Sequence, residues 1–310
     1  MLTAPNTPMP SVAADDPRVG NLLGTAVEPG QPPAIVLIGF PVDEGVRRNG
    51  GRIGAAEGPA AIRQAFYRLT PDPAVPAMSE LLRRTVDLGD VAAGENLEAA
   101  QEALAEATAP HLAAGSLVIV LGGGHETAFG HFLGAVRAGI EVELLNWDAH
   151  ADVRPLRDGL GHSGSPFRQA LEHPSGLARR YTVAGLQPQS IAAAHLDYVR
   201  AHGRAVFASA LTSTVVTEIY ALLQHRALAS FDLDALDQSL APGVSAPASN
   251  GLGTSLWLDA AERAGANPNV IGCEIVELNP RFDRDDQTAR LAALTVWRVI
   301  RGRTMVVASR

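Results

Sequence analysis

The sequence predicts a three-layer α/β/α sandwich built on a mainly parallel sheet. Short runs of consecutive apolar residues recur along the chain, which is typical of strands buried on both faces. Stretches of helical length separate these runs, and such alternation favours a parallel sheet covered by helices on both sides. No internal repeat and no linker divides the chain. We therefore expect one large domain, with its ligand site outside the carboxyl ends of the strands.

The first elements are assigned from composition and from helix-start signals. Residues 1–33 are rich in Pro, Ala, Gly and Asp, so we predict a flexible N-terminal arm there and a single domain over residues 34–310. The apolar run 35–40 is the first strand of the domain. A polar, Gly-rich loop follows, and Pro59 suits the first turn of a helix that continues to about residue 69.

The remaining apolar runs are assigned to strands, and the segments between them to helices. Further strands are predicted at residues 85–88, 117–121, 142–145, 181–185, 205–209, 227–231, 270–276 and 305–308. Helices are predicted at 97–112, 126–138 and 288–300, with others between the later strands.

The composition excludes several classes of protein. A formal charge of −8 argues against a general nucleic-acid binder, although local arginines can still bind a small anion. The lone cysteine, Cys273, excludes an internal disulfide and suits a reducing compartment. No apolar run is long enough to span a bilayer, and the N-terminus lacks a secretory signal. We expect a cytoplasmic protein that binds neither nucleic acid nor a membrane.

Metal-ligating residue types follow three of the predicted strands. One such residue alone often only caps a helix or braces a loop, but three sets at one sheet edge indicate a common site. Residues two apart on an extended backbone point to the same side, so each set would project together. Six ligands suit two divalent ions about 3.5–4 Å apart, and a carboxylate-rich set without thiolates favours Mn²⁺. The candidates are His125, Asp148, His150, Asp152, Asp232 and Asp234.

The motifs around these residues are similar to those of a known family. G-G-G-H (122–125), D-A-H-A-D (148–152) and S-F-D-L-D-A-L-D (230–237) resemble the three signatures of the ureohydrolase, or arginase-like, family. The downstream P-G-V-S-A-P and E-L-N-P segments also fit. The resemblance implies an arginase-like fold, a homo-oligomer, and two Mn²⁺ per subunit held by the six candidates. It also implies that Glu277 grips the nitrogen end of the substrate.

Within this family the loop 39–52 resembles the branch that hydrolyses N-formimidoyl-L-glutamate to L-glutamate and formamide, in histidine degradation. Gly124 stands where arginases and agmatinases usually carry Asp. Ser163, in S-G-S-P-F-R-Q, stands where they usually carry His, and His162 lies one residue earlier. The family's proton-shuttle role is therefore not transferred to His162.

Arginines near the site suit a dicarboxylate substrate, because guanidinium groups bind carboxylates in bidentate fashion. Arg154 lies two residues after Asp152 and would repel the cationic end of arginine or agmatine. We predict that Arg154, Arg47, Arg48 and Ser163 bind substrate, and Arg52 is a further candidate in the same loop.

For the reaction, we predict that Asp152 passes a proton to the departing amine and that Glu277 orients the amidinium group. Three alternatives stay open. The chain could be a related amidinohydrolase that releases urea from agmatine or another guanidino acid, or a metal-binding protein of this fold without turnover. A two-metal phosphoesterase is the third, but the D-A-H-A-D spacing and the E-L-N-P segment have no place in one.

Overall fold

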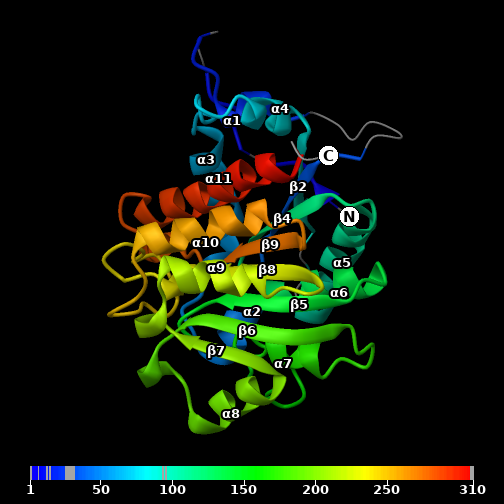
Figure 1. Ribbon diagram of the computed structural model, residues 1–310, viewed down its shortest axis with the longest axis vertical. Coiled ribbons are helices and arrows are strands. Elements are labelled where there is room, and N and C mark those ends of the chain that lie inside the picture. Colours follow the sequence, from blue (N-terminus) through cyan, green and yellow to red (C-terminus); the bar gives the residue numbers. More distant parts are fainter. Residues whose placement is uncertain are drawn as a thin grey trace.

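The computed structural model has three layers, with a sheet between two groups of helices (Figure 1). It describes residues 2–5, 7–11, 13, 15–24, 32–92, 94 and 96–307. Within these residues nine strands form the sheet in the order β1-β3-β2-β4-β9-β8-β5-β6-β7. Only β1 and β3 pair antiparallel, so the predicted sandwich with a mainly parallel sheet is confirmed.

The strands are β1 (Leu2–Thr3), β2 (Ile35–Phe40), β3 (Thr85–Val91), β4 (Leu117–Gly122), β5 (Val142–Trp147), β6 (Ala178–Leu186), β7 (Gly203–Phe207), β8 (Arg226–Asp232) and β9 (Val270–Val276). The α-helices are α1 (Val19–Leu22), α2 (Glu44–Asn49), α3 (Gly58–Tyr67), α4 (Ala77–Arg83), α5 (Leu97–Ala113), α6 (Thr127–Arg137), α7 (Pro166–Leu171), α8 (Ala193–His202), α9 (Ser213–Ala221), α10 (Thr254–Ala266) and α11 (Gln287–Val307).

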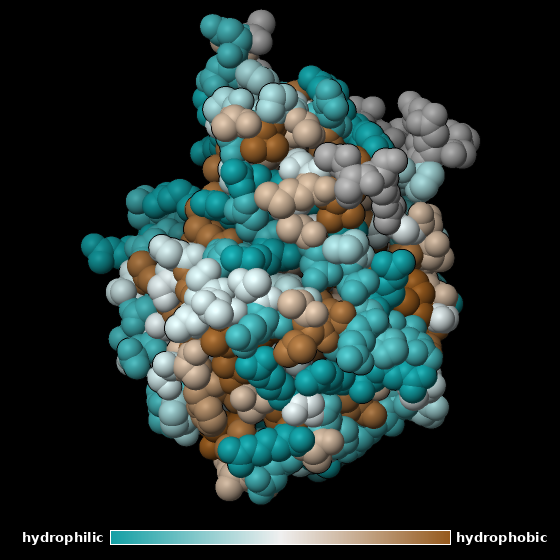
Figure 2. Space-filling view, viewed as in Figure 1, coloured by the Kyte–Doolittle hydropathy of each residue, from teal (hydrophilic) through white to brown (hydrophobic). Residues whose placement is uncertain are grey.

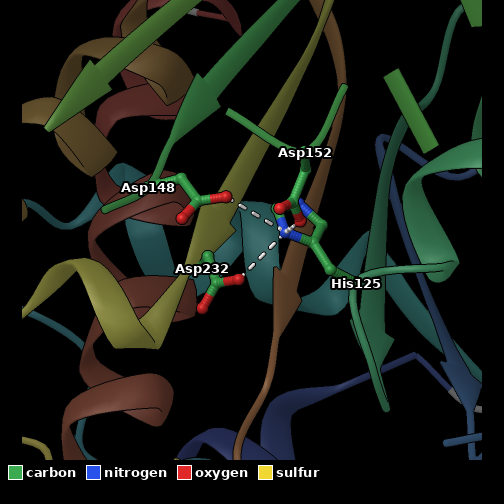
Figure 3. Close-up of side chains that lie close together, drawn as sticks. All are labelled: His125, Asp148, Asp152 and Asp232. Atoms are coloured by element: carbon green, nitrogen blue, oxygen red, sulfur yellow. Dashed lines mark ion pairs between the residues drawn. The ribbon is translucent and has the colours of Figure 1, made fainter. Parts of the chain in front are cut away.

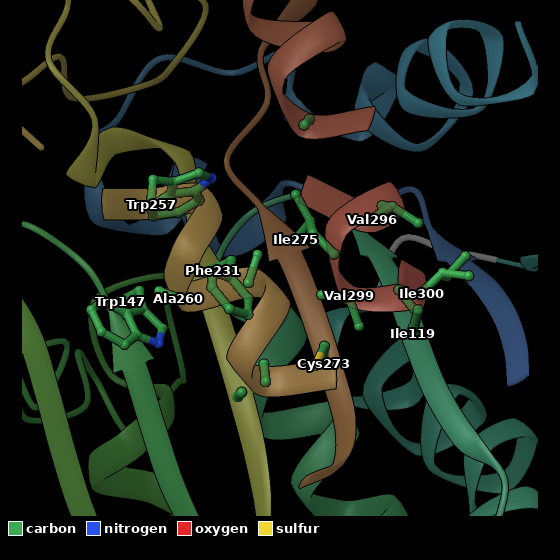
Figure 4. Packing of buried hydrophobic residues seen from close by; sticks show 14 of the residues in the cluster. Ile119, Trp147, Phe231, Trp257, Ala260, Cys273, Ile275, Val296, Val299 and Ile300 are labelled. Carbon is green, nitrogen blue, oxygen red and sulfur yellow. The ribbon is translucent and has the colours of Figure 1, made fainter. Parts of the chain in front are cut away.

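The two faces of the sheet bury separate apolar cores. In β2, Ile35 and Leu37 pack into the core formed with α1, α3, α4, α9, α10 and α11. Val36 and Ile38 face the other core, formed with α5, α6, α7 and α8. Figure 4 shows the first core, where Trp257 of α10 packs against Phe231 of β8 with ring centroids 5.4 Å apart. Burial on both faces explains why the strands are continuous apolar runs.

The predicted strand 305–308 is wrong as far as it is described, because residues 305–307 form the end of α11. Gly302 inside the helix and the β-branched pair after Met305 favour a break locally. Close packing on α10 outweighs that preference. A Cβ at Gly302 would lie 2.0 Å from the carbonyl oxygen of Glu262, and one at Gly265 1.9 Å from that of Val299. Gly265 and Gly302 thus let the backbones of the two helices approach closely near the C-terminal part of α11.

Two other segments differ from expectation. The Gly-rich loop after β2 contains a short helix, α2, whose C-terminal cap is Gly50 with φ of +79°. Part of residues 1–33 lies against the domain, since Leu2 and Thr3 pair with β3 and Val19 of α1 is buried. The boundary between a flexible arm and the domain at residue 34 stays a prediction.

The surface over α9, α10 and α11 mixes hydrophilic and hydrophobic residues without separating them into broad zones (Figure 2). Among the described residues, no helix has both the length and the apolar character needed to cross a membrane.

Candidate metal centre

The predicted ligands lie at the carboxyl ends of β4, β5 and β8, and Glu277 lies at the end of β9, which stands between β4 and β8 in the sheet. His125 follows β4 by three residues, and Asp148 comes directly after β5. Asp232 is the last residue of β8, while Glu277 comes directly after β9. Parallel strands place all these ends at one edge, as expected for ligand sites of open α/β sheets.

Four of the residues form a first group of potential metal ligands: His125, Asp148, Asp152 and Asp232. The Nδ1 atom of His125 lies 2.9 Å from a carboxylate oxygen of Asp232, 3.0 Å from one of Asp152 and 3.3 Å from one of Asp148. Figure 3 shows the carboxylates of the three aspartates converging on the imidazole.

A second group consists of Asp148, His150 and Asp234. The Nδ1 atom of His150 lies 3.2 Å from a carboxylate oxygen of Asp234 and 3.4 Å from one of Asp148. Because Asp148 belongs to both groups, the six predicted residues form one continuous cluster. That arrangement suits two cations that share a carboxylate.

The ligands after β5 converge for a different reason from the one expected. The strand ends at Trp147, residues 148–150 form a bend, and Asp152 has φ of +46°. The backbone N–H of His150 donates to Asp148 Oδ1 at 2.6 Å, which fixes the bend. The same spacing recurs after β8, where Asp234 N donates to Asp232 Oδ1 at 2.8 Å. Turns closed by aspartate side chains, rather than an extended backbone, bring these residues together.

Two polar residues that the sequence analysis gave no role orient the ligands. His125 Nε2 lies 2.8 Å from Ser230 Oγ, so an Nε2–H that donates to this hydroxyl leaves the Nδ1 lone pair for a metal. Asn146 Nδ2 donates to Asp148 Oδ2 at 2.9 Å. Both residues lie inside strands two positions before a ligand, so the alternation of strand side chains is the signal that could have found them.

The charges of the cluster are unbalanced without a cation. Burial, with repulsion from Asp234 and Asp148, raises the pKa of Asp232 well above its usual value. Burial raises the pKa of Asp234 to about 6. The charge of Asp234 raises the pKa of His150 to about 12. Burial lowers the pKa of His125, but the surrounding carboxylates outweigh it and hold that pKa well above the usual value.

The donor set fits divalent cations. Among the described residues, His125 Nδ1 and Asp234 Oδ1 are buried and find no hydrogen-bond partner, although a buried polar atom normally has one. Oxygen and imidazole ligands without thiolates match a metal of the Mn²⁺ type. A cation among these atoms would satisfy both of them and offset the repulsion between the aspartates. The assignment of the six residues as ligands stays a prediction that this geometry supports.

A cavity of about 300 Å³ opens above the cluster. It is lined by ligand residues, by Glu277, by the predicted substrate residues Arg154 and Ser163, and by residues that the sequence analysis did not single out. Its lining consists of Asn49, Gly50, Gly51, Arg52, His150, Asp152, Arg154, Ser163, Asp232, Asp234, Ser245, Ala246 and Glu277.

Arg47 and Arg48, which we predicted to bind substrate, do not line this cavity. Arg47 is exposed and its guanidinium group pairs with Glu44. Arg48 pairs with Glu44 at 3.0 Å and with Glu98 at 2.5 Å. Carboxylates of the protein therefore neutralise both arginines. Helix α2 turns them away from the site, and the helix was not predicted from the sequence.

Glu277 presents a free oxygen to the site. Its Oε1 accepts a hydrogen bond from His125 N at 2.9 Å, whereas Oε2 is buried and has no partner. Its φ of +67° is unusual for a residue with a side chain, and strain of this kind concentrates at functional sites. Burial, with repulsion from Glu126 and Asp234, raises the pKa of Glu277 well above its usual value. A cationic group beside Oε2 would favour the ionised carboxylate.

His162 has a structural role in the loop after β5. Its Nδ1 accepts a hydrogen bond from Gly164 N at 3.1 Å, and its Nε2 lies 3.1 Å from the carbonyl oxygen of Pro155. Nε2–H must donate to that oxygen, so the ring is neutral. Burial also lowers the pKa of His162. Both ring nitrogens are occupied, which leaves none for moving protons.

Gly124 is a glycine because a neighbouring side chain fills its place. A Cβ there would lie 2.2 Å from Glu126 Oε2. Glu126 is fully buried, and its Oε1 accepts a hydrogen bond from Gly45 N, at the start of α2, at 2.6 Å. The carboxylate thus fixes α2 against the end of β4.

A three-layer α/β/α sandwich with six candidate metal ligands at the carboxyl ends of strands of one parallel sheet is typical of hydrolases that use two divalent ions. The chain belongs to the arginase family, whose model matches residues 33–301. The resemblance inferred from the three motifs and the arginase-like fold are therefore confirmed.

Several of the most similar relatives belong to one branch of this family. The chain is 40% identical over 294 residues to formimidoylglutamase of Rhodococcus jostii, covering 87% of this chain and 86% of that one. A crystal structure of Trypanosoma cruzi formiminoglutamase with Mn²⁺ superposes with a TM-score of 0.86 at 35% identity, covering 94% and 99% of the two chains. Formimidoylglutamase from Bacillus subtilis gives a TM-score of 0.84 at 25% identity, covering 96% and 95%.

Proposed function

We propose that the protein hydrolyses N-formimidoyl-L-glutamate to L-glutamate and formamide with two Mn²⁺ per subunit. The branch of its relatives supports this reaction, and so does the Mn²⁺ in the T. cruzi structure. The observation that carries the proposal is the placement of Arg154, which has no carboxylate partner among the described residues and lines a cavity above a carboxylate cluster.

The charge pattern of the cavity matches the two ends of this substrate. Within the described part of the chain, Arg154 forms no ion pair, and its Nη1 donates to the neutral Asn49 Oδ1 at 3.0 Å. Arg52 also lines the cavity, where it bonds to carbonyl oxygens of Val244 and Ser245 and stacks on the ring of Phe282. Two guanidinium groups without carboxylate partners can receive the carboxylates of a glutamate derivative.

The opposite end of the substrate is an amidinium group, which suits Glu277. The uncommitted Oε2 would accept an amidinium N–H in a charge-assisted hydrogen bond. The metal pair, when bound, supplies a water of lowered pKa that is nucleophilic near neutral pH. Attack of this water on the formimidoyl carbon breaks the C–N bond to glutamate. Asp152 faces the cavity and would carry the proton of the water to the departing nitrogen.

A guanidino substrate fits the same cavity less well. Arginine and agmatine each carry a cationic end in addition to the guanidinium group, and Arg154 and Arg52 would repel it. Guanidino acids without a second cation lack one of the two carboxylates that these arginines could receive.

The same proposal has consequences for the pathway, the location and the assembly of the protein. We infer a role in histidine degradation, a cytoplasmic location and a homo-oligomeric assembly. A buried, unpaired Cys273 agrees with a reducing compartment.

A substrate comparison tests the proposed function. The purified, Mn²⁺-loaded protein would be given N-formimidoyl-L-glutamate, arginine, agmatine, 4-guanidinobutyrate and a phosphomonoester in parallel. We expect turnover of the first compound only, with glutamate and formamide released in equal amounts. Release of urea from a guanidino compound at a higher kcat/KM would contradict the proposal.

Replacing Arg154 by alanine is expected to raise KM for formimidoylglutamate by about 100-fold, because a bidentate arginine–carboxylate contact contributes about 3 kcal/mol. The change removes a contact far from the reacting carbon, so kcat should change little. Steady-state kinetics checks this, with Arg200→Ala on α8, an exposed arginine, as the matched control. An unchanged KM would remove Arg154 from the substrate pocket.

A further inference from the structure

We propose that Asn49 is a positioning residue, which holds the Arg154 guanidinium and the Ser163 hydroxyl in place for the substrate carboxylate. The inference rests on the proposed function, because it concerns how a carboxylate of formimidoylglutamate is bound. Asn49 is the last residue of α2 and lies in the loop 39–52 that resembles one branch of the family, but the sequence analysis gave the residue itself no role.

The amide of Asn49 connects the two substrate residues. Its Oδ1 accepts a hydrogen bond from Arg154 Nη1 at 3.0 Å, and its Nδ2 donates to Ser163 Oγ at 3.1 Å. All three side chains line the cavity. An amide group is suited to this place because it accepts from the arginine and donates to the serine at once.

The backbone around the three side chains is closely fitted. Arg154 N donates to the carbonyl oxygen of Gly164 at 2.9 Å, which joins the two ends of the loop after β5. A Cβ at Gly164 would lie 3.0 Å from Arg154 Cδ and 3.2 Å from Asn49 Nδ2. A side chain at this position would press on both the arginine and the asparagine, so the glycine favours their close packing.

Asn49 itself is held from both ends of its helix. Glu126 accepts the N–H of Gly45 in the first turn of α2, and Gly50 ends the helix in the left-handed conformation. The helix is thereby fixed to the end of β4, which also carries the ligand His125. A fixed amide reduces the rotamer freedom that Arg154 would otherwise lose when substrate binds.

The neutrality of Asn49 is as important as its position. A carboxylate in its place would pair with Arg154 and compete with the substrate, as Glu44 and Glu98 pair with Arg48. The amide holds the guanidinium without neutralising it. Arg154 thus keeps both its orientation and its charge for an incoming carboxylate.

The test is a double-mutant cycle on the Mn²⁺-loaded enzyme with Asn49→Ala, Arg154→Ala and the double variant. We expect Asn49→Ala to raise KM for formimidoylglutamate by about 10-fold, since a hydrogen bond to a charged group is lost. Its kcat should stay within about two-fold. In the Arg154→Ala background the substitution should raise KM by much less, because only the contact of Asn49 with Ser163 is then left to lose. A structural defect alone would instead lower kcat or act equally in both backgrounds.

Two further variants keep the test decisive. Asn49→Asp retains the shape of the side chain but pairs with Arg154, so its KM should rise at least as much as that of Asn49→Ala. Asn21→Ala, an exposed asparagine on α1, is the matched control and should leave KM unchanged. Thermal unfolding midpoints and bound Mn²⁺ would be measured for each variant to identify any loss of folded enzyme.

The outcomes separate the inference from the proposed function. Suppose that the wild type turns over formimidoylglutamate. An unchanged KM in both Asn49 variants, or additive effects in the double-mutant cycle, would then overturn the role of Asn49 and leave the proposed function intact. Absence of that turnover in the wild type would overturn both.

Discussion

Asp148→Asn is expected to lower kcat/KM by on the order of 10³-fold and to reduce bound Mn²⁺ below two per subunit. Asp148 belongs to both ligand groups, so its charge would serve both cations. Its two oxygens accept hydrogen bonds from His150 N and Asn146 Nδ2, and an asparagine could accept only one of these, because its NH2 group donates. Losing the charge stabilisation of a bound metal costs several kcal/mol, which corresponds to this factor.

Metal content measured by elemental analysis, together with steady-state kinetics, checks this result. Asp197→Asn on α8, an aspartate whose side chain is mostly exposed, is the matched control and should keep two Mn²⁺ and full turnover. A variant Asp148→Asn that retained two Mn²⁺ and wild-type turnover would refute the shared carboxylate.

Glu277→Gln is expected to lower kcat/KM by about 10²- to 10³-fold without loss of metal, as removal of one dedicated hydrogen-bonding group from an active site does. The glutamine can still accept the hydrogen bond from His125 N that now goes to Oε1. Its NH2 group cannot accept an amidinium N–H where Oε2 does, and it carries no charge. Because the side chains have the same shape, the strained backbone at this position should be preserved.

In the Glu277→Gln variant, turnover should fall while the metal content stays at two Mn²⁺ per subunit. Kinetics and elemental analysis would be run beside Glu172→Gln, an exposed glutamate directly after α7, which should behave as the wild type. If Glu277→Gln lost Mn²⁺ in proportion to its activity, Glu277 would support the metal ligands rather than the substrate.

Most strands could be predicted because burial on both faces leaves a plain signal, a continuous apolar run. The runs before His125, Asp148 and Asp232 correspond to β4, β5 and β8, with ends one or two residues later than predicted. Helix α11 could not be bounded in this way. Its last turn depends on contact with α10, which a local pattern of Gly302 and β-branched residues does not contain.

The approach of the six candidate ligands could likewise be predicted, since each set follows a strand of one parallel sheet. The reason given for the spacing was wrong in detail. Asp148 and Asp232 close turns with their own carboxylates, and the ligands separate into two groups that share Asp148. Ligand residues two positions apart in a sequence can lie on an extended strand or in a turn, and the sequence pattern does not distinguish the two.

The sequence by itself determined the family, the layered fold and the residues that offer metal ligands, because these depend on order along the chain and on strand ends. Only the tertiary structure decided which arginines face the cavity. Arg47, Arg48 and Arg52 lie within six residues of one another, yet α2 pairs the first two with carboxylates and leaves the third in the cavity wall. The meeting of Asn49 with Arg154 also depends on packing, since 105 residues separate them and no local pattern records their contact.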